Sequence, residues 1–262
     1  MGDVIPPDVI GAPDGRTPNG AADPRPREIR RGQRVATPAY WRRADHAPSC
    51  RDRRVTPVAV VEPYADLARR VLAGPPRLGR TRLVAVDGPS GAGKSRFATH
   101  LADALAALPG GGRPPLVHTD DLLDGWDDQF TFWARLEEQV LAPLRAGRAG
   151  AYRRYSWVRR EFLPDVVPVP VGPVLLVEGV SAARAKARPE LTLGVFVTAP
   201  APLRLARAVA RDGPEILPHL RRWHAGEEAH FTADRTAERV DLVVDGAPGL
   251  PHDRARYYVR LP

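Results

Sequence analysis

The residues best suited to chemistry form one short glycine-rich run, Gly88-Pro89-Ser90-Gly91-Ala92-Gly93-Lys94-Ser95. This run matches the pattern G-x-x-x-x-G-K-[ST] at every fixed position, with an apolar strand pattern before it and a helix pattern after it. The glycines let backbone N–H groups curve around phosphate oxygens at a helix N-terminus. The lysine reaches the outer phosphates, and the final serine supplies a hydroxyl to Mg²⁺. We therefore predict a phosphate-binding loop (P-loop) for ATP and Mg²⁺, contacted by Gly88, Ser90, Gly91, Ala92, Gly93, Lys94, Ser95 and Arg96.

The sequence lacks the second motif that three other classes of P-loop protein require: Ras-type GTPases, ABC-type ATPases, and helicases with AAA-type motors. The chain has one asparagine, Asn19, so it has no N-K-x-D segment of the kind that reads guanine in GTPases. An L-S-G-G-Q signature is absent, and the apolar strand at 174–177 ends in Glu178-Gly179 rather than in an Asp-Glu pair. These absences leave mainly kinases of small molecules.

A pair of carboxylates stands where an acceptor would bind. Asp120 and Asp121 follow the predicted strand at 116–119, and ligands of open α/β sheets sit beyond the carboxyl ends of the strands. A carboxylate there can orient or deprotonate an attacking hydroxyl. The alternative is a turn or a helix cap, since aspartate is favoured in both.

A second acceptor candidate is the run at 152–160, in which aromatic residues alternate with arginines. Aromatic rings can stack on a base while guanidinium groups hold phosphate or hydroxyl groups. The predicted acceptor contacts are Asp121, Tyr152, Arg154, Tyr155 and Trp157. The alternative is an exposed arginine-rich hairpin, and Trp126 is either a further aromatic platform or simple packing.

The elements needed to position these residues are read from apolar runs and helical periodicity. Strands are expected at 82–87, 116–119, 174–177, 191–197 and 242–244. Helices are expected at 62–73, 94–108, 129–146, 202–211 and 215–230. Alternating strands and helices predict an α/β fold with a parallel sheet flanked by helices, of the P-loop NTPase type and similar to nucleoside and nucleotide kinases. The domains expected are a helical lead-in at 58–79 and the kinase-like domain at 80–262.

Residues 1–57 differ in composition from the rest of the chain. They hold nine of the 29 prolines and eleven arginines against seven acids, without a periodic apolar pattern. We expect a disordered extension, because such a stretch buries too little apolar surface to offset its ordering entropy. The alternatives are a basic tail that contacts phosphates or a partner, and a start codon placed too far upstream.

Composition bounds the remaining classes. The 262 residues carry a net charge of +8, yet only Lys94 and Lys186 are lysines, so the arginine excess is typical of a GC-rich coding bias and a dedicated nucleic-acid binder is not favoured. No apolar run is long enough to cross a bilayer, no signal peptide is visible, and Cys50 is the only cysteine. These features predict a cytoplasmic protein without a membrane partner, and nothing in them specifies an oligomeric state.

Taken together, the P-loop, the Asp120-Asp121 pair and the strand ending in Glu178-Gly179 resemble the uridine kinase-like nucleoside kinases, a family that includes phosphoribulokinase and pantothenate kinase relatives. The resemblance covers residues 80–247 and is similar to actinobacterial uridine kinase-like proteins with a D-D-L-x-x-G-W-D stretch, here residues 120–127. It implies that Asp120, or else Asp121, is the catalytic base and that Glu178 helps Ser95 to hold Mg²⁺. One departure is Leu122-Leu123, where these kinases commonly carry an aromatic pair.

Arginines also recur along the predicted helix at 202–211. Arg204, Arg207 and Arg211 share one helix face, and the resemblance implies that Arg207 and Arg211 are lid arginines that neutralise the transferring phosphoryl group. The alternative is a solvated basic face. In the next segment, 221–231, we expect Trp223 and Phe231 to pack, and the spacing of His224 and His230 argues against a metal site.

The sequence therefore predicts an ATP- and Mg²⁺-dependent phosphotransferase with a small hydroxyl acceptor, a nucleoside of the uridine or cytidine kind being favoured. The first alternative is a kinase for a nucleotide, a pantothenate-like acid or a sugar phosphate, which would use the arginines at 153–160. The second, from another class, is a regulatory ATP-binding or nucleic-acid-associated protein.

Overall fold

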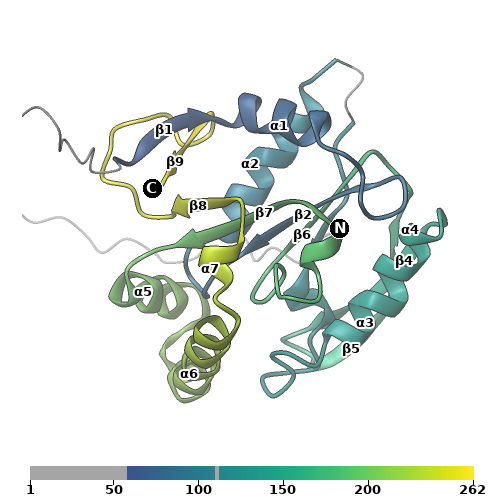
Figure 1. Cartoon of the computed structure of the whole chain (residues 1–262). Coiled ribbons are helices and arrows are strands. Elements are labelled where there is room, and N and C mark those ends of the chain that lie inside the picture. Colours follow the sequence, from purple (N-terminus) through teal and green to yellow (C-terminus); the bar gives the residue numbers. More distant parts are fainter. Residues whose placement is uncertain (1–57, 110–111) are drawn as a thin grey trace, which may run out of the picture. The chain divides into compact units, whose positions relative to one another are not determined.

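The chain is represented by a computed structural model that describes residues 58–109 and 112–262 (Figure 1). The disorder expected for residues 1–57 lies outside these described residues. A seven-stranded sheet forms the centre of the described part. Its strands are β1 (Val60–Pro63), β2 (Arg82–Asp87), β3 (Leu116–His118), β6 (Val174–Glu178), β7 (Leu191–Thr198), β8 (Leu242–Asp245) and β9 (Tyr257–Arg260).

The strand order is β1-β9-β8-β7-β2-β6-β3. The five strands from β8 to β3 pair in parallel, which confirms the predicted α/β fold class. The edge differs from a purely parallel sheet, because β9 pairs antiparallel with β8 and β1 pairs antiparallel with β9. The lead-in expected to be helical thus begins with strand β1, followed by helix α1 (Tyr64–Ala73).

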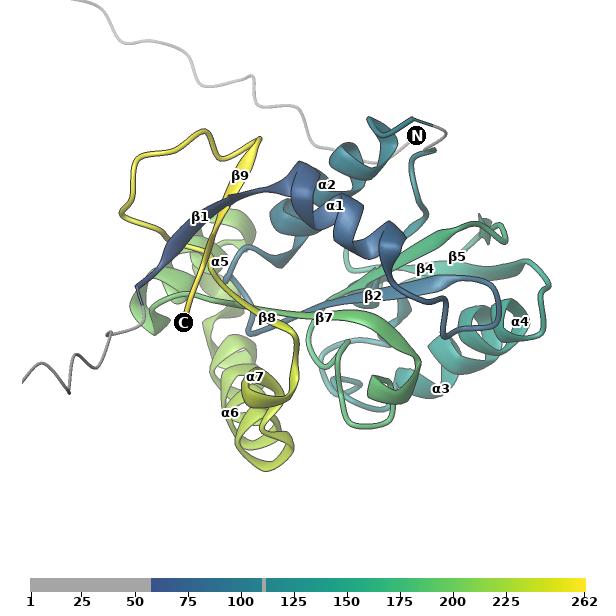
Figure 2. The same cartoon turned by 45° about the horizontal axis from the view of Figure 1, so that its top comes forward.

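Two helical layers bury the apolar faces of the sheet. Helices α1 and α2 (Lys94–Ala106) cover one face, where their buried side chains form one core with β2, β6, β7 and β8 (Figure 2). On the other face lies a continuous helix composed of α3 (Trp133–Leu136), a π-helical turn η2 (Glu137–Leu141) and α4 (Ala142–Arg145). The sequence places this helix at 129–146, and the structure begins it four residues later.

The remaining elements within the described residues are a hairpin, three helices and three short 3-10 turns. Strands β4 (Gly150–Ser156) and β5 (Glu161–Val169) form a separate antiparallel hairpin. Helices α5 (Ala201–Asp212), α6 (Leu217–Asp234) and α7 (Thr236–Arg239) precede β8, and short 3-10 turns lie at η1 (Thr119–Leu122), η3 (Arg188–Glu190) and η4 (Pro214–Ile216). Among the helices of the described part, none has the length and apolar character needed to cross a membrane.

The parallel pairing determines which residues meet. Strands β2, β3 and β6 are neighbours and run in the same direction, so their carboxyl ends share one edge of the sheet. The P-loop follows β2, η1 follows β3, and Glu178 ends β6. The fold thereby brings three segments that are distant in the sequence to the place where open α/β sheets bind their ligands.

Candidate active site

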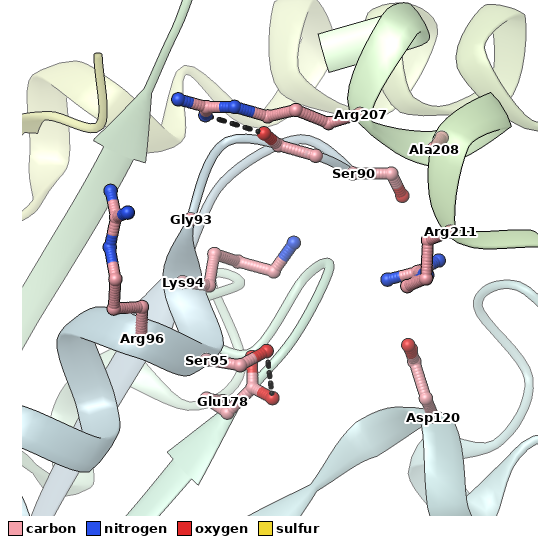
Figure 3. A pocket seen from close by; sticks show the side chains of 11 residues that line it. Ser90, Gly93, Lys94, Ser95, Arg96, Asp120, Glu178, Arg207, Ala208 and Arg211 are labelled. Atoms are coloured by element: carbon pink, nitrogen blue, oxygen red, sulfur yellow. Dashed lines mark hydrogen bonds between the residues drawn. The ribbon is translucent and has the colours of Figure 1, made fainter. Parts of the chain in front are cut away.

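A cavity of about 240 Å³ lies over the P-loop at this edge (Figure 3). The Lys94 side chain is only 9% exposed and extends into the cavity, where its ammonium donates a hydrogen bond to the Pro89 carbonyl at 3.2 Å. The lining residues are Ser90, Gly91, Gly93, Lys94, Ser95, Arg96, Asp120, Glu178, Arg207, Ala208 and Arg211. Of the predicted nucleotide contacts, Gly88 and Ala92 are buried outside this lining.

The P-loop conformation requires glycine where the loop meets helix α5. Gly91 has a φ of +76°, and a Cβ there would lie 2.5 Å from the Arg204 carbonyl oxygen. No larger residue fits this approach, and L side chains rarely adopt this backbone conformation. Glycine at this position thus allows the loop to pack against helix α5 as well as to curve.

The predicted metal ligands, Ser95 and Glu178, lie side by side. The Ser95 hydroxyl donates to Glu178 Oε1 at 2.9 Å (Figure 3), and His118 Nδ1 lies 2.5 Å from the same oxygen. Burial alone would raise the pKa of Glu178, but the hydrogen bond with His118 and the charge of Lys94 lower it. One hydroxyl and one ionised carboxylate beside a phosphate cavity form a donor set that fits Mg²⁺, which takes few protein ligands and completes its shell with phosphates and water.

The end of strand β2 is tied to the loop after β6 through Asp87. This fully buried carboxylate accepts backbone N–H groups of Gly88 at 2.7 Å, Ser181 at 2.7 Å and Ala183 at 2.9 Å. Burial raises the pKa of Asp87 to about 6, against the effect of these three donors. Asp87 therefore holds the start of the P-loop in register with the segment that carries Glu178.

The two acidic candidates point to different places. The Asp120 side chain lines the cavity and faces Arg211 across it (Figure 3). Asp121 instead accepts a hydrogen bond from the Tyr152 hydroxyl at 3.1 Å, on the side of the hairpin. Asp120 is exposed to the open cavity, yet the protein packed around its carboxyl and the charge of Glu178 raise its pKa, against the opposing charges of Lys94 and Arg211. This placement favours Asp120 over Asp121 as the group that meets an acceptor hydroxyl.

The predicted lid arginines lie on helix α5 above the P-loop. Arg207 donates a hydrogen bond to the Gly91 carbonyl at 3.0 Å (Figure 3) and another to the Gly246 carbonyl at 3.2 Å. Its guanidinium is therefore bound to two backbone carbonyls. Arg211 forms an ion pair with Asp212, with nitrogen–oxygen distances of 2.8 and 2.6 Å. Of the two, Arg211 is the cation directly opposite Asp120.

The predicted acceptor contacts become part of an aromatic cluster beside Asp120. Trp157 donates its indole N–H to the Asp120 carbonyl at 3.3 Å, and its side chain is 37% exposed. The Trp126 ring lies 5.2 Å from that of Trp157 and stacks on His219 at 5.4 Å. Tyr152 and Tyr155 are buried behind this surface.

The other residue proposed for acceptor binding, Arg154, is half-buried. Burial raises the pKa of Asp121, and the charge of Arg154 is one of several effects that oppose this rise. Among the predicted acceptor contacts, Trp157 is therefore the exposed aromatic residue and Arg154 is the one cation. Trp126, for which the sequence left packing or a platform open, contacts the exposed ring directly.

One polar residue of the site was missed from the sequence. Glu227 on helix α6 is 2% exposed and accepts the backbone N–H of Ser90 at 2.8 Å and its hydroxyl at 2.5 Å. The Trp223 indole donates to the same oxygen at 2.9 Å, and Arg204 lies 3.6 Å from the other. Trp223 is buried as expected, but the segment 221–231 also clamps the P-loop. The four-residue spacing of Trp223 and Glu227 was the available signal.

His230 and Phe231 pack against aromatic rings. Phe231 meets Phe196 edge to face at 5.1 Å, and His230 lies 4.9 Å from Phe130. Within residues 58–109 and 112–262, no cluster of three histidine, cysteine or acidic side chains is arranged to hold a metal ion.

Comparison with known proteins identifies the fold. No protein-family model matches the chain, and no curated protein matches its sequence. Among solved structures, one described as a "possible uridine kinase" from Bacillus stearothermophilus matches with a TM-score of 0.50 and 18% identity, over 69% of this chain and 96% of that one. A protein provisionally named a fructose transport system kinase from Silicibacter matches with a TM-score of 0.48 and 22% identity, over 68% of this chain and 95% of that one.

The first of these matches shows that the described part of this chain adopts a P-loop kinase-like fold. Together with the P-loop cavity, this defines the structural class of the protein. At such low identity the likeness concerns the fold alone, and the resemblance to the actinobacterial subgroup stays a prediction.

Proposed function

We propose that the protein is a small-molecule kinase that uses ATP and Mg²⁺ to phosphorylate a hydroxyl group. The observation that carries this proposal is the position of Asp120. Its carboxylate shares one cavity with the P-loop lysine and the Ser95–Glu178 pair, opposite Arg211. A protein that only binds ATP has no need of a carboxylate at the place where an acceptor would approach the γ-phosphate.

The proposed reaction divides the work among these residues. Backbone N–H groups of the P-loop and the Lys94 ammonium hold the ATP phosphates, and the nucleotide is oriented for in-line transfer. Mg²⁺, held by Ser95 and Glu178, would neutralise charge on the phosphate oxygens. Asp120 orients the acceptor hydroxyl and takes its proton, the hydroxyl oxygen bonds to the γ-phosphorus, and the bond to the β–γ bridging oxygen breaks to release ADP. Arg211 lies where it can stabilise charge on the transferring group.

For the acceptor we favour a nucleoside of the uridine or cytidine kind. Support comes from the half-exposed Trp157 ring beside Asp120, because a planar base can stack on such a surface while its sugar hydroxyl reaches the carboxylate. An anionic acceptor, such as a nucleotide, a pantothenate-like acid or a sugar phosphate, is the second candidate. It is favoured by Arg154, whose charge lies near the acidic pair.

The test measures ADP release from ATP and Mg²⁺ in the presence of nucleosides, nucleotides, sugar phosphates and small hydroxy acids. Lys94→Ala is the blank, and Lys186→Ala is the matched control, because it removes the only other lysine, which is exposed. We expect acceptor-dependent ADP release that survives in Lys186→Ala and vanishes in Lys94→Ala. Tight ATP binding without acceptor-dependent release across the whole panel would contradict the kinase proposal and favour a regulatory ATP-binding protein.

A further inference from the structure

A second cavity, of about 440 Å³, lies against the hairpin and shares no lining residue with the cavity over the P-loop. It is bounded by the helix α3–η2 on one side and by strands β4 and β5 on the other. Its lining residues are Arg135, Gln139, Ala151, Tyr152, Arg153, Phe162 and Val166. This volume falls within the range of roughly 300–1,000 Å³ that small-molecule sites occupy.

The lining has the chemistry of a site for a flat anion. It contains two guanidinium groups, one amide and two aromatic rings, and it contains no carboxylate. The Arg135 guanidinium lies over the Phe162 ring, 5.5 Å from the ring centroid, so the aromatic ring supports the flat cation from one side. Arg135 also forms an ion pair with Asp128, whereas the Arg153 side chain is exposed and forms no hydrogen bond or ion pair with any described residue. Arg153 therefore brings an uncompensated positive charge to the rim.

The helix that faces this cavity is locally irregular. Residues 137–141 form a π-helical turn, and Gln139 lies within it, four residues after Arg135. A π-turn is rare, is retained against the better hydrogen bonding of an α-helix, and occurs often at functional sites. Here it lies where the amide of Gln139 joins the cavity lining.

Two hydrogen bonds connect the cavity wall to the acidic segment of the active site. Arg135 Nε donates to the Leu122 carbonyl at 2.7 Å, and the Tyr152 hydroxyl donates to Asp121 at 3.1 Å. Leu122 and Asp121 belong to η1, the turn that also carries Asp120. A ligand that rearranges Arg135 or Tyr152 would therefore act on the segment that holds the proposed base.

We propose that this second cavity binds a small planar anion, a flat ring that carries a carboxylate or a phosphate. Occupancy of the cavity reduces the local motion of residues 119–128. The ligand ring stacks on the Arg135 guanidinium, which Phe162 supports from the other side, and the anionic group meets Arg153. Gln139 is placed to donate or accept a hydrogen bond at the ligand's edge. The site goes beyond the proposed kinase activity, and its binding step does not depend on that activity.

Binding is tested by calorimetric titration of the full chain with four probes, in the presence of saturating ADP and Mg²⁺. Salicylate and uridine monophosphate combine a ring with an anion, whereas inorganic phosphate lacks the ring and benzyl alcohol lacks the charge. We expect at least one of the first two probes to bind, with about tenfold or greater loss in Arg153→Gln, and the last two to bind more weakly. Which of the first two binds tells a carboxylate ligand from a phosphate ligand. The matched control is Arg159→Gln, an exposed arginine of the same hairpin outside the lining.

A second variant and a second readout locate the probe. Val166→Trp places a large ring in the cavity from a half-exposed strand position, and it should abolish binding without changing the urea midpoint of unfolding. When the probe is bound, amide hydrogen exchange should slow in residues 135–141 and 162–169, which line this cavity and carry none of the proposed acceptor contacts, and also in 119–128. This slowing should be absent in Arg153→Gln. The proposal is overturned if neither ring-bearing anion binds, if Arg153→Gln and Arg159→Gln bind alike, or if protection falls on residues 88–95. Because both readouts work without turnover, their failure is distinct from failure of the kinase proposal.

Discussion

The two halves of the candidate site are built in different ways. The donor half, residues 88–95, is one continuous loop between a strand and a helix, and most of its shape follows from its own glycines and the helix that it starts. The acceptor half is assembled from η1, the hairpin β4–β5 and helix α6, which meet through Trp126, Trp157 and Trp223. Local sequence thus specifies the first half, and tertiary packing specifies the second.

This difference has a consequence for function. In the proposed function, backbone N–H groups of the donor half would hold the phosphates, so most side-chain changes there should leave these donors in place. In the acceptor half the contacts come from side chains, and each one contributes separately. Substitutions should therefore have graded effects on the acceptor side, with the single exception of the proposed base.

The largest effect is expected from Asp120→Asn, which tests whether the two halves meet at a catalytic group. The amide cannot take a proton, so we expect the transfer rate to fall about 10²–10⁴-fold. ATP binding, measured by calorimetry, should change little, because the P-loop donors are untouched. Asp121→Asn is the matched control and should lose much less, since Asp121 bonds to Tyr152 rather than lining the cavity. Equal losses in the two variants would assign no special role to Asp120.

The same residue predicts a pH dependence. The pKa of Asp120 is raised above its ordinary value of 3.8 by the surrounding protein and by the charge of Glu178. A protonated carboxyl cannot accept the hydroxyl proton, so kcat/KM should fall about tenfold per pH unit below this raised pKa. This acidic fall in the pH profile of kcat/KM should lie above pH 3.8, and it should be missing from the residual activity of Asp120→Asn. An identical fall in both enzymes would place the titrating group elsewhere.

Glu227→Gln tests the contact between helix α6 and the P-loop in the donor half. This change keeps the shape of the side chain but removes the charge that Ser90 and Arg204 face in a buried position. We expect the free energy of unfolding in urea to fall by about 1–3 kcal/mol, because a charge-assisted bond is weakened and a nearby guanidinium loses its partner. The exposed neighbour, in the variant Glu228→Gln, should change it by less than about 0.5 kcal/mol. An unchanged stability in Glu227→Gln would mean that the clamp on Ser90 contributes little.

Sequence patterns predicted the central sheet and missed its edge for a physical reason. Strands β2 and β6 are buried on both faces and appear as continuous apolar runs, which are readable without a structure. Strands β1 and β9 have four residues each and pair across nearly the whole described chain, as the bond from Tyr258 to Glu62 shows. No local period marks such a pairing, because each strand is short and only partly buried.

The site divides in the same way. The P-loop residues could be proposed from the sequence because a phosphate-binding loop is a local motif. Asp120 could be proposed because strand ends converge in a parallel sheet. Glu227 was missed because its partner, Ser90, lies 137 residues away, and the four-residue spacing from Trp223 indicates a shared helix face but not that partner. The aromatic character of 152–160 was visible, but which rings face the acceptor depends on the hairpin register, in which Tyr155 pairs with Phe162 and turns inward.

On the acceptor side, Trp157→Ala removes the exposed ring beside Asp120. We expect KM for the acceptor to rise about tenfold, since stacking of a base on an aromatic ring contributes about 1–3 kcal/mol. The value of kcat and the KM for ATP should change much less, because the carboxylate and the P-loop remain. Val158→Ala is the matched control, a 90% exposed neighbour that makes no part of the aromatic cluster. A fall in kcat at constant KM would show that Trp157 positions Asp120 through its bond to the backbone instead of contacting the acceptor.

The smallest effect is expected from Tyr152→Phe, which removes one hydroxyl from the contact between the hairpin and η1. The bond to Asp121 is 3.1 Å long and partly buried, so its loss should lower the free energy of unfolding by about 0.5–1.5 kcal/mol. Tyr155→Phe, in the same strand, removes a hydroxyl with no hydrogen bond to the described residues and should have little effect. Hydrogen exchange in residues 119–128 should quicken in the first variant alone, because Tyr152 ties the acidic turn to the hairpin. If both variants behave alike, η1 is held by Arg135 and its own backbone, and the acceptor half is less dependent on the hairpin than its contacts imply.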